Sequence, residues 1–374
     1  MRIGIDGTRI MVPDGGGRYT FNLIKYLIED NRNEYVLILP KIIDEFEKEN
    51  VNQVITPSCE GLKERFRFFI SLHSILKKER VDVFHCTTNY GIINSPCPVV
   101  VTVHDLITIK HPLLRSTKVE YYIYKYILSS LLKRAAAIIT VSESTKKDLI
   151  KYFKLSNGLI NIIYNGYNQS TFHAEYEENS DLDILNKYKV KPGYILFVGY
   201  ITPKKNLDTL LSALALLKKQ GKLNCKLVIV GSKGYRYSLI KNKIIELQLQ
   251  ENIVELGFVP DNELSAIYRN TSVFVYPSIY EGFGLPPLEA MACGCPVITS
   301  NTSSLPEVVG DAGIMVDPYD VDGLADAMHE VLTNDGLRAN MIKKGLERAE
   351  MFSWEKCARE TLEVYEEVYQ QSEG

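Results

Sequence analysis

The chain has 374 residues, which is long for one domain and favours two domains of similar size. Hydrophobic residues make up 45% of the chain and charged residues 24%, as in ordinary soluble proteins. The formal net charge of -3 argues against a general nucleic-acid binder, which needs a strongly basic surface.

The N-terminus and the cysteines bear on location. The first residues, MRIGIDGTRI, predict a strand and lack the apolar core of a signal peptide, and no run approaches the roughly 18 apolar residues of a membrane span. The seven cysteines are scattered and odd in number, which favours reduced thiols in a cytoplasm over a disulfide framework. Cys293 and Cys295 have no second Cys/His pair at zinc-like spacing, so we expect small buried residues there.

In the first half of the chain, short runs rich in Val and Ile alternate with amphipathic segments. The runs predict strands at 2–6, 35–40, 81–86, 98–104, 136–141 and 160–164, each buried on both faces of a sheet. The amphipathic segments 19–29 and 119–134 predict helices between them. This order is the βαβ pattern of a parallel, doubly wound sheet.

Residues 169–191 interrupt this pattern, because they are polar and acidic and have little apolar periodicity. We interpret them as an interdomain linker with some helix. Strands are then predicted at 194–200, 226–231, 253–259, 273–277, 296–299 and 313–316, and a last helix at 354–369. The chain is thus predicted to form two Rossmann-like α/β domains, 1–168 and 192–353, facing a central cleft, with a C-terminal helix in 354–374 crossing the domain junction.

Ligands of open parallel sheets bind outside the carboxyl ends of the strands, so residues that directly follow strands are the candidates for a site. The most informative segment is 275–294, VYPSIYEGFGLPPLEAMACG. Pro286 and Pro287 predict the first turn of a helix, with Glu289 in that turn and Gly294 at the end of the helix.

Backbone amides at this helix start would bind a diphosphate, because glycines allow close approach and helix N-termini attract anions. The residues concerned are Gly282, Phe283, Gly284 and Leu285. Glu289 would accept hydrogen bonds from ribose hydroxyls, as acidic residues do in dinucleotide folds, and Glu281 would lie nearer a sugar. From two glutamates alone, a solvated corner with a helix-dipole Glu is the simpler interpretation.

The segment 197–206, FVGYITPKKN, follows the first strand of the second half. Lys204 and Lys205 precede a helix predicted to begin near Leu207, so their charge adds to a helix dipole that favours anions. Charge-assisted bonds from lysine to phosphate would stabilise charge that develops on a leaving diphosphate. A solvated surface pair is the alternative.

Two candidates lie in the first half. His104 and Asp105 end an apolar strand; a histidine can bond a sugar hydroxyl, and the adjacent carboxylate could fix its tautomer. A histidine that only caps the strand is the alternative. In the stretch 13–19, PDGGGRY, Gly16 and Gly17 would allow close approach of a ligand and Arg18 adds charge, or the stretch is a flexible turn. It matches neither a dinucleotide nor an ATP-binding fingerprint.

Together these motifs resemble those of the family-4 retaining glycosyltransferases of the GT-B fold, over nearly the whole chain. The resemblance rests on Glu281 and Glu289 with seven residues between them, followed by MACGCPVITS and LPEVV, and on the HD and PKKN motifs. It implies that Glu289 holds the ribose of a nucleotide diphosphate-sugar donor and that Glu281 contacts the transferred sugar. Lys205, with Lys204, would neutralise the diphosphate, and many relatives also carry an arginine where Tyr200 stands here.

The resemblance further divides the two domains by role. The first would bind the acceptor, through Arg18, His104 and Asp105, and the second the nucleotide-sugar. Catalytic roles are implied for Glu281, His104 and Lys205. Gly16 and Gly17 would border the diphosphate, and Phe258 and Val259 would lie near the nucleotide base. We expect no metal and no cofactor, since the DxD-like pair Asp181 and Asp183 follows no strand.

The HDL and PKKN variants of the motifs resemble those of mannosyl- and rhamnosyl-transferring members, which favours GDP-mannose as the donor. The expected reaction is retaining transfer of a hexose to a glycan or lipid-linked acceptor, in polysaccharide or glycolipid assembly. A sugar-nucleotide 2-epimerase of the same fold and a non-catalytic carbohydrate-binding protein stay open as alternatives.

One further segment predicts a surface role. Residues 62–78 combine basic side chains with phenylalanines at roughly helical spacing, and 115–125 is a second basic-aromatic run. Such helices can lie on an anionic membrane. We expect peripheral association with the inner membrane from the cytoplasmic side; packed helices with solvated charges are the alternative.

Overall fold

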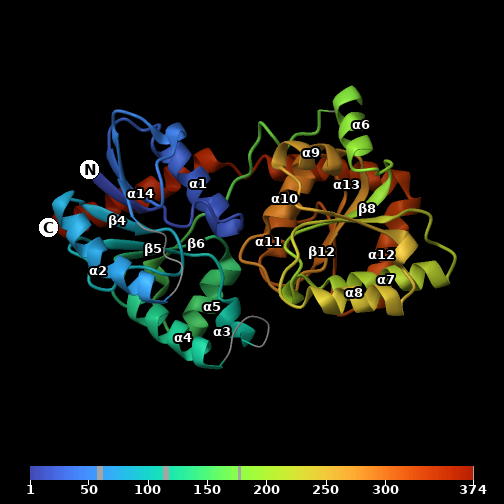
Figure 1. The fold of residues 1–374 in the computed structure, drawn as a ribbon, viewed down its shortest axis with the longest axis horizontal. Coiled ribbons are helices and arrows are strands. Elements are labelled where there is room, and N and C mark those ends of the chain that lie inside the picture. The colour runs from blue at the N-terminus through green and yellow to red at the C-terminus, as the bar shows by residue number, and fades with distance from the viewer. Residues whose placement is uncertain (57–61, 113–117, 176–177, 374) are drawn as a thin grey trace. The chain divides into compact units, whose positions relative to one another are not determined.

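The computed structural model describes residues 1–56, 62–112, 118–175 and 178–373. Contacts divide the chain into two compact units (Figure 1). The first comprises Met1–Gly166 together with Trp354–Gly374, and the second comprises Tyr167–Ser353. Each unit is a parallel sheet with helices on both faces, so the prediction of two Rossmann-like α/β domains is confirmed.

The sheet of the first unit has seven strands in its described residues. They are β1 (Arg2–Asp6), β2 (Glu34–Leu39), β3 (Val51–Ile55), β4 (Val83–Cys86), β5 (Val99–Val103), β6 (Ala137–Thr140) and β7 (Ile160–Ile162), in the order β3-β2-β1-β4-β5-β6-β7 and all parallel. Six of them overlap predicted strands. The exception is β3, an edge strand whose residues are only partly buried, so it lacks the continuous apolar run of the others.

Helices cover both faces of this sheet. On one face, α1 (Gly15–Leu27) packs against α14 (Trp354–Glu373). On the other face lie α2 (Leu62–Lys78), α4 (Lys118–Leu132) and α5 (Glu143–Phe153), while the short α3 (Ile107–Lys110) contacts α4 (Figure 1). Residues of α2, α4 and α5 share one core cluster with the strands, including Phe68, Leu72, Leu128 and Leu149.

The C-terminal helix α14 belongs to the first unit although it is the last element of the chain. Its Tyr365 hydroxyl lies 2.5 Å from Nδ1 of His85 on β4, and the His85 Nε2 lies 2.7 Å from the Thr102 hydroxyl on β5. These three side chains are fully buried. A buried polar group costs free energy unless it is hydrogen-bonded, so this chain of bonds specifies how α14 packs on the sheet.

The sheet of the second unit has six strands in its described residues, again all parallel. They are β8 (Tyr194–Val198), β9 (Leu227–Val230), β10 (Ile253–Gly257), β11 (Thr271–Tyr276), β12 (Val297–Ser300) and β13 (Ile314–Val316), in the order β10-β9-β8-β11-β12-β13. One face carries α7 (Leu207–Lys219), α8 (Tyr237–Glu246) and α12 (Val321–Thr333); the other carries α9 (Asp261–Arg269), α10 (Leu285–Ala292) and α13 (Asp335–Ala349) (Figure 1). The short α11 (Leu305–Val309) follows β12.

The segment interpreted as a linker contains the helix α6 (Glu178–Lys187), which packs on α9 within the second unit. Asp181 is fully buried and lies 2.6 Å from Arg269 in an ion pair, and it also accepts a hydrogen bond from Asn270. One of the acidic residues of this segment, Asp181, therefore has a structural role. A buried carboxylate that is paired in this way anchors its helix.

Within the residues that the structure describes, we find no helix with the combination of length and hydropathy that crossing a bilayer requires.

Candidate functional site

The parallel strands of the second unit place the predicted donor residues at one edge of its sheet. Lys204 and Lys205 form the short 3-10 turn Pro203–Lys205 after β8, and Glu281 follows β11. Because β8 and β11 are neighbours in the sheet, their carboxyl ends lie side by side. The Ile279 amide donates to the Lys204 carbonyl at 2.8 Å, which ties the two loops together.

The two lysines and Glu281 form an ion-paired cluster. Lys205 Nζ lies 2.7 Å from Glu281 Oε1, and Lys204 Nζ lies 3.5 Å from Oε2. Only 9% of Lys205 and 7% of Glu281 is exposed. Charged groups at such depth are stable when paired and hydrogen-bonded, as these are. Two cations and one anion leave the cluster one positive charge, which favours an anionic ligand.

Three donors converge on Oε1 of Glu281. Besides Lys205, the Ser278 hydroxyl lies 2.5 Å away and the Tyr276 hydroxyl 3.1 Å away. Burial raises the pKa of the Glu281 carboxyl, but the charges of Lys204 and Lys205 and these hydrogen bonds outweigh burial and lower the pKa to about 2. Glu281 is therefore a carboxylate at neutral pH, with one oxygen held by its neighbours.

Sequence reasoning missed Tyr276 and Ser278, although both stand at or just after the end of β11. It also missed two serines of the loop that follows β12. The Ser303 hydroxyl accepts a hydrogen bond from the Glu281 amide at 3.0 Å, and the Ser304 hydroxyl donates to the Phe283 carbonyl at 2.7 Å. Their position just after a strand could have identified them as candidates. Their hydrogen-bond partners depend on which strands are neighbours in the sheet.

The loop from Glu281 to α10 has the backbone geometry that its glycines allow. Gly284 has a φ of 114°, and a Cβ there would lie 2.9 Å from the Leu305 side chain. The helix α10 begins at Leu285 with Pro286 and Pro287 in its first turn, as predicted. It ends at Ala292, followed by Gly294 with a φ of 72°, also as predicted.

The predicted placement of Glu289 in the first turn is wrong, because α10 starts at Leu285 and its first turn holds no acidic residue. Glu289 lies one turn further along the helix. Only 4% of it is exposed, and the Tyr268 hydroxyl lies 3.4 Å from its Oε2. Glu289 is thus a buried carboxylate of α10 that lies beside Tyr268 of α9.

Three of the predicted donor residues have different environments. The Phe283 ring is buried and packs edge-on against Phe352, with 5.7 Å between ring centroids, so this side chain belongs to the core. Val259 is also buried, whereas 65% of Phe258 is exposed. Beside them, a hollow of about 190 Å³ lies at the ends of β9 and β10; it is lined by Ile201, Ile229, Gly231, Lys233, Glu255, Leu256 and Gly257.

Tyr200, which stands where many relatives of the resembled family carry an arginine, is 56% exposed. It stands three residues before Pro203, where the Pro203–Lys205 turn begins. Among the hydrogen bonds and ion pairs of the described residues, none joins Tyr200 to the lysine–glutamate cluster. The positive charge at this sheet edge therefore comes from Lys204 and Lys205.

In the first unit, His104 is oriented by a backbone carbonyl. Its Nε2 lies 2.8 Å from the Thr87 carbonyl, which can only accept, so this nitrogen carries the proton. Asp105, which was expected to fix the tautomer, accepts a hydrogen bond from the Ile107 amide at 3.2 Å. Burial lowers the pKa of His104, which favours the neutral ring, and the Tyr19 ring packs edge-on against it.

The glycines in the first turn of α1 have roles within that turn. The Asp14 side chain caps the helix by accepting a hydrogen bond from the Gly17 amide at 2.9 Å. A Cβ at Gly17 would lie 2.0 Å from the Val12 carbonyl oxygen, whereas a Cβ at Gly16 would meet nothing closer than 3.4 Å. Packing within the turn thus explains Gly17. Arg18 is half-buried on the same turn, after the helix start.

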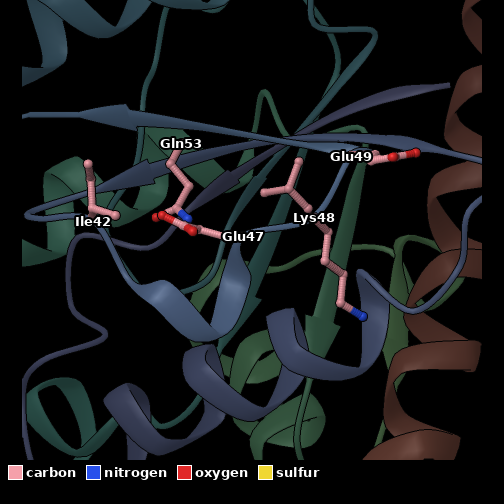
Figure 2. Close-up of a pocket in the computed structure, with 6 residues that line it drawn as sticks. Ile42, Glu47, Lys48, Glu49 and Gln53 are labelled. Atoms are coloured by element: carbon pink, nitrogen blue, oxygen red, sulfur yellow. The ribbon is translucent and has the colours of Figure 1, made fainter.

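A larger hollow, of about 510 Å³, lies elsewhere in the first unit, next to the edge strand β3 (Figure 2). It is lined by Ile42, Glu47, Lys48, Glu49, Val51 and Gln53. None of the predicted site residues lines it. The acidic and basic side chains in Figure 2 point in different directions, so no set of charges converges there.

The phenylalanines of α2 are only partly described. Phe68 is buried in the core cluster, which agrees with the packed-helix alternative for this residue. Side chains at 62–67, 69 and 70, which include Lys63, Arg65 and Arg67, lie outside what the structure describes. In α4, Tyr121 and Tyr124 pack against the core, while Tyr122, Ile123 and Tyr126 are 68%, 45% and 74% exposed.

Comparison with solved structures places this fold in the GT-B class. Sucrose-phosphate synthase from Thermosynechococcus elongatus superposes with a TM-score of 0.82 at 20% identity, covering 99% of this chain and 100% of that one. At this identity the likeness concerns the fold. Its two units, each with a parallel sheet, give the chain the GT-B fold.

Sequence comparison gives the family. The profile described as "Glycosyl transferases group 1" matches residues 182–348, and "Glycosyltransferase Family 4" matches residues 13–171. O-antigen chain mannosyltransferase B of Escherichia coli is 36% identical over 268 residues, which cover 71% of this chain and 69% of that protein. The serotype-specific mannosyltransferase WbdA of Escherichia coli is 30% identical over 75% of this chain, which spans only 35% of that protein. The chain belongs to the family-4 glycosyltransferases.

Proposed function

We propose that this glycosyltransferase moves a hexose from a nucleotide diphosphate-sugar to a glycan or lipid-linked acceptor, in polysaccharide or glycolipid assembly. Mannose from GDP-mannose is the favoured donor. Transfer proceeds with retention of the anomeric configuration and without a metal ion. The lysine–glutamate cluster at the start of the loop to α10 carries the proposal, because it combines positive charge, an oriented carboxylate and backbone amides at one sheet edge.

In the proposed reaction, Lys204, Lys205 and the amides of residues 282–285 bind the diphosphate, and Glu281 and Glu289 bind the sugar and the ribose. The bond between the anomeric carbon and the phosphate oxygen breaks, and its electron pair leaves with the diphosphate. The acceptor oxygen bonds to the anomeric carbon on the same face and gives its proton to a phosphate oxygen. The lysines lower the barrier by stabilising the charge that grows on the diphosphate.

The retaining step without a covalent intermediate is supported by how Glu281 is held. A double displacement needs a carboxylate that is free to attack the anomeric carbon. Glu281 instead has Oε1 engaged by Lys205, Tyr276 and Ser278, and Oε2 beside Lys204. It is suited to accept hydrogen bonds from sugar hydroxyls.

The choice of mannose and of an O-antigen-like acceptor is supported by the relatives. Two of them are O-antigen chain mannosyltransferases, and a third is a serotype-specific mannosyltransferase. For the acceptor side, His104 has its proton on Nε2, toward Thr87, so the neutral ring would present Nδ1 as an acceptor for a sugar hydroxyl. The exposed tyrosines of α4 support work at a lipid surface, since tyrosine rings favour the membrane–water interface.

A thermal-shift screen with GDP-mannose, GDP-rhamnose, UDP-glucose, UDP-galactose and their free nucleotides tests the donor. A ligand at about 100 times its dissociation constant adds roughly 2.7 kcal/mol of stability, which such a screen detects. NMR of the product of the donor that binds then gives the anomeric configuration. An inverted product would refute the mechanism, and epimerised sugar released without an acceptor would indicate a 2-epimerase.

A further inference from the structure

We propose that Tyr276 is a positioning residue of the donor site, whose hydroxyl and ring hold the Lys205 ammonium where it meets the diphosphate. The inference rests on the proposed function, in which Lys205 binds the leaving group. Tyr276 is the last residue of β11 and is fully buried.

Tyr276 contacts both members of the buried ion pair. Its oxygen accepts a hydrogen bond from Lys205 Nζ, because an ammonium only donates. Its own proton then goes to Glu281 Oε1, 3.1 Å away. Burial, followed by the charge of Glu281, raises the pKa of Tyr276 well above its usual value, so the phenol keeps the proton that it donates. Lys205 Nζ also lies 4.7 Å from the centre of the Tyr276 ring, within cation–π distance.

A lysine needs such a partner if its ammonium group is to be held at one position. Its four-carbon stem is flexible, so ordering it costs rotamer entropy. Glu281 alone restrains Nζ from one direction only. The Tyr276 hydroxyl and ring restrain it from a second direction, and they do so from a strand, which moves less than a loop.

The Tyr276 ring is itself held by the core of the second unit. It stacks on Phe197 of β8 and on Phe274 of its own strand, with centroid distances of 6.0 Å and 5.7 Å. Gly199 lies beside both side chains: a Cβ there would lie 3.6 Å from Lys205 Cε and 3.7 Å from Tyr276 Cε2. The strand core therefore determines where the Lys205 charge sits.

The test is Tyr276→Phe, which keeps the ring and removes the hydroxyl. With the nucleotide-sugar that the wild type uses, kcat should fall about tenfold while the donor KM changes less than about threefold, because Lys205 acts mainly on charge that grows in the transition state. GDP, or UDP if the wild type binds UDP, carries the charge of the leaving group and should bind about tenfold more weakly by calorimetry.

A double-mutant cycle distinguishes positioning from a general structural role. In a Lys205→Met background, Tyr276→Phe should have no further effect on kcat or on nucleotide affinity. Tyr194→Phe is the matched control, since Tyr194 is a buried tyrosine of the same unit whose hydroxyl donates to the Ile267 carbonyl at 2.6 Å. Its kcat should equal that of the wild type, and thermal unfolding of all variants shows that they are folded.

If Tyr276→Phe leaves kcat and nucleotide affinity unchanged, the inference is wrong. It is also wrong if the substitution lowers them equally with and without Lys205. Both results leave the proposed function intact. A wild type that transfers no sugar but binds the nucleotide in a Tyr276-dependent way overturns the function and keeps the inference. A wild type that binds neither GDP nor UDP overturns both.

Discussion

Lys205 and Glu281 stand 76 residues apart in the chain and form a buried ion pair, with 2.7 Å between Nζ and Oε1. Removing one partner of a buried pair leaves the other charge uncompensated, which is usually costly. Here Lys204 remains near the second carboxylate oxygen, 3.5 Å from Oε2, so Glu281 keeps a cation when Lys205 is replaced. This makes single substitutions in the cluster informative about function.

Lys205→Met should reduce kcat by about 10²–10³-fold, because it removes a cation that faces charge developing on the diphosphate. The donor KM should change much less. Steady-state kinetics with the identified donor measure both. Lys219→Met, an exposed lysine at the end of α7, is the control. Equal effects of the two substitutions would place Lys205 outside the site.

The ionised Glu281 should make a pH-dependent contribution to stability. Its folded pKa of about 2 lies below the value of about 4.3 for an unfolded glutamate. The stabilisation is thus fully present above about pH 4.3 and is lost as the pH falls toward about 2. Denaturant unfolding measures this effect. The free energy of unfolding of the wild type should exceed that of Glu281→Gln by a constant amount from about pH 7 to 5, and this difference should become smaller below that range.

Glu251→Gln, at an exposed position, is the control for this experiment. If the difference in free energy of unfolding between wild type and Glu281→Gln grew on acidification, folding would disfavour the ionised carboxylate. That result would contradict the ion pairs seen here.

Glu289→Gln should weaken nucleotide binding by about tenfold and leave kcat within about threefold of the wild type, because a ribose contact is made equally in the ground and transition states. Calorimetry with the free nucleotide and kinetics with the sugar donor measure the two effects. A large fall in kcat at unchanged affinity would instead place Glu289 at the reacting atoms.

Transfer should survive EDTA, because Lys204, Lys205 and the amides at the start of α10 supply the positive charge that a divalent ion would otherwise provide. The measurement is the transfer rate with and without chelator, and after manganese or magnesium is added back. Complete loss that either metal restores would contradict this mechanism.

The protein should co-sediment with anionic vesicles at low salt, and binding should weaken as salt rises. The double variant Arg65→Glu, Arg67→Glu should bind the vesicles more weakly, because it replaces positive with negative charge. The double variant Tyr122→Ser, Tyr126→Ser should also bind more weakly, because it removes exposed aromatic area from α4. Tyr319→Ser, at a tyrosine 67% exposed in the second unit, should have no effect. A wild type that stays in the supernatant at low salt would favour a soluble acceptor.

Much of the fold follows from local sequence. Strands such as Val99–Val103, which is apolar except for Thr102, and Leu227–Val230 are nearly continuous apolar runs. Burial on both faces of a sheet satisfies such a run, so a parallel sheet could be predicted. The weakly buried edge strand Val51–Ile55 lacks this signal and was missed. The start and end of α10 were predictable because Pro286 and Pro287 fix φ for a first helical turn, whereas Gly294 readily takes the positive φ that follows a helix end.

By itself, then, the sequence determined which residues follow strands, and therefore that Lys204, Lys205 and Glu281 would lie at a sheet edge. Tertiary structure decided what they contact. Lys205 meets Glu281 because β8 pairs with β11, and Tyr276 joins them because its ring is packed on Phe197 of the neighbouring strand. Likewise the proton of His104 is directed by the Thr87 carbonyl rather than by the adjacent Asp105. Hydrogen bonds and ion pairs act over about 3–4 Å, and such distances between residues far apart in the chain arise only from strand order and packing.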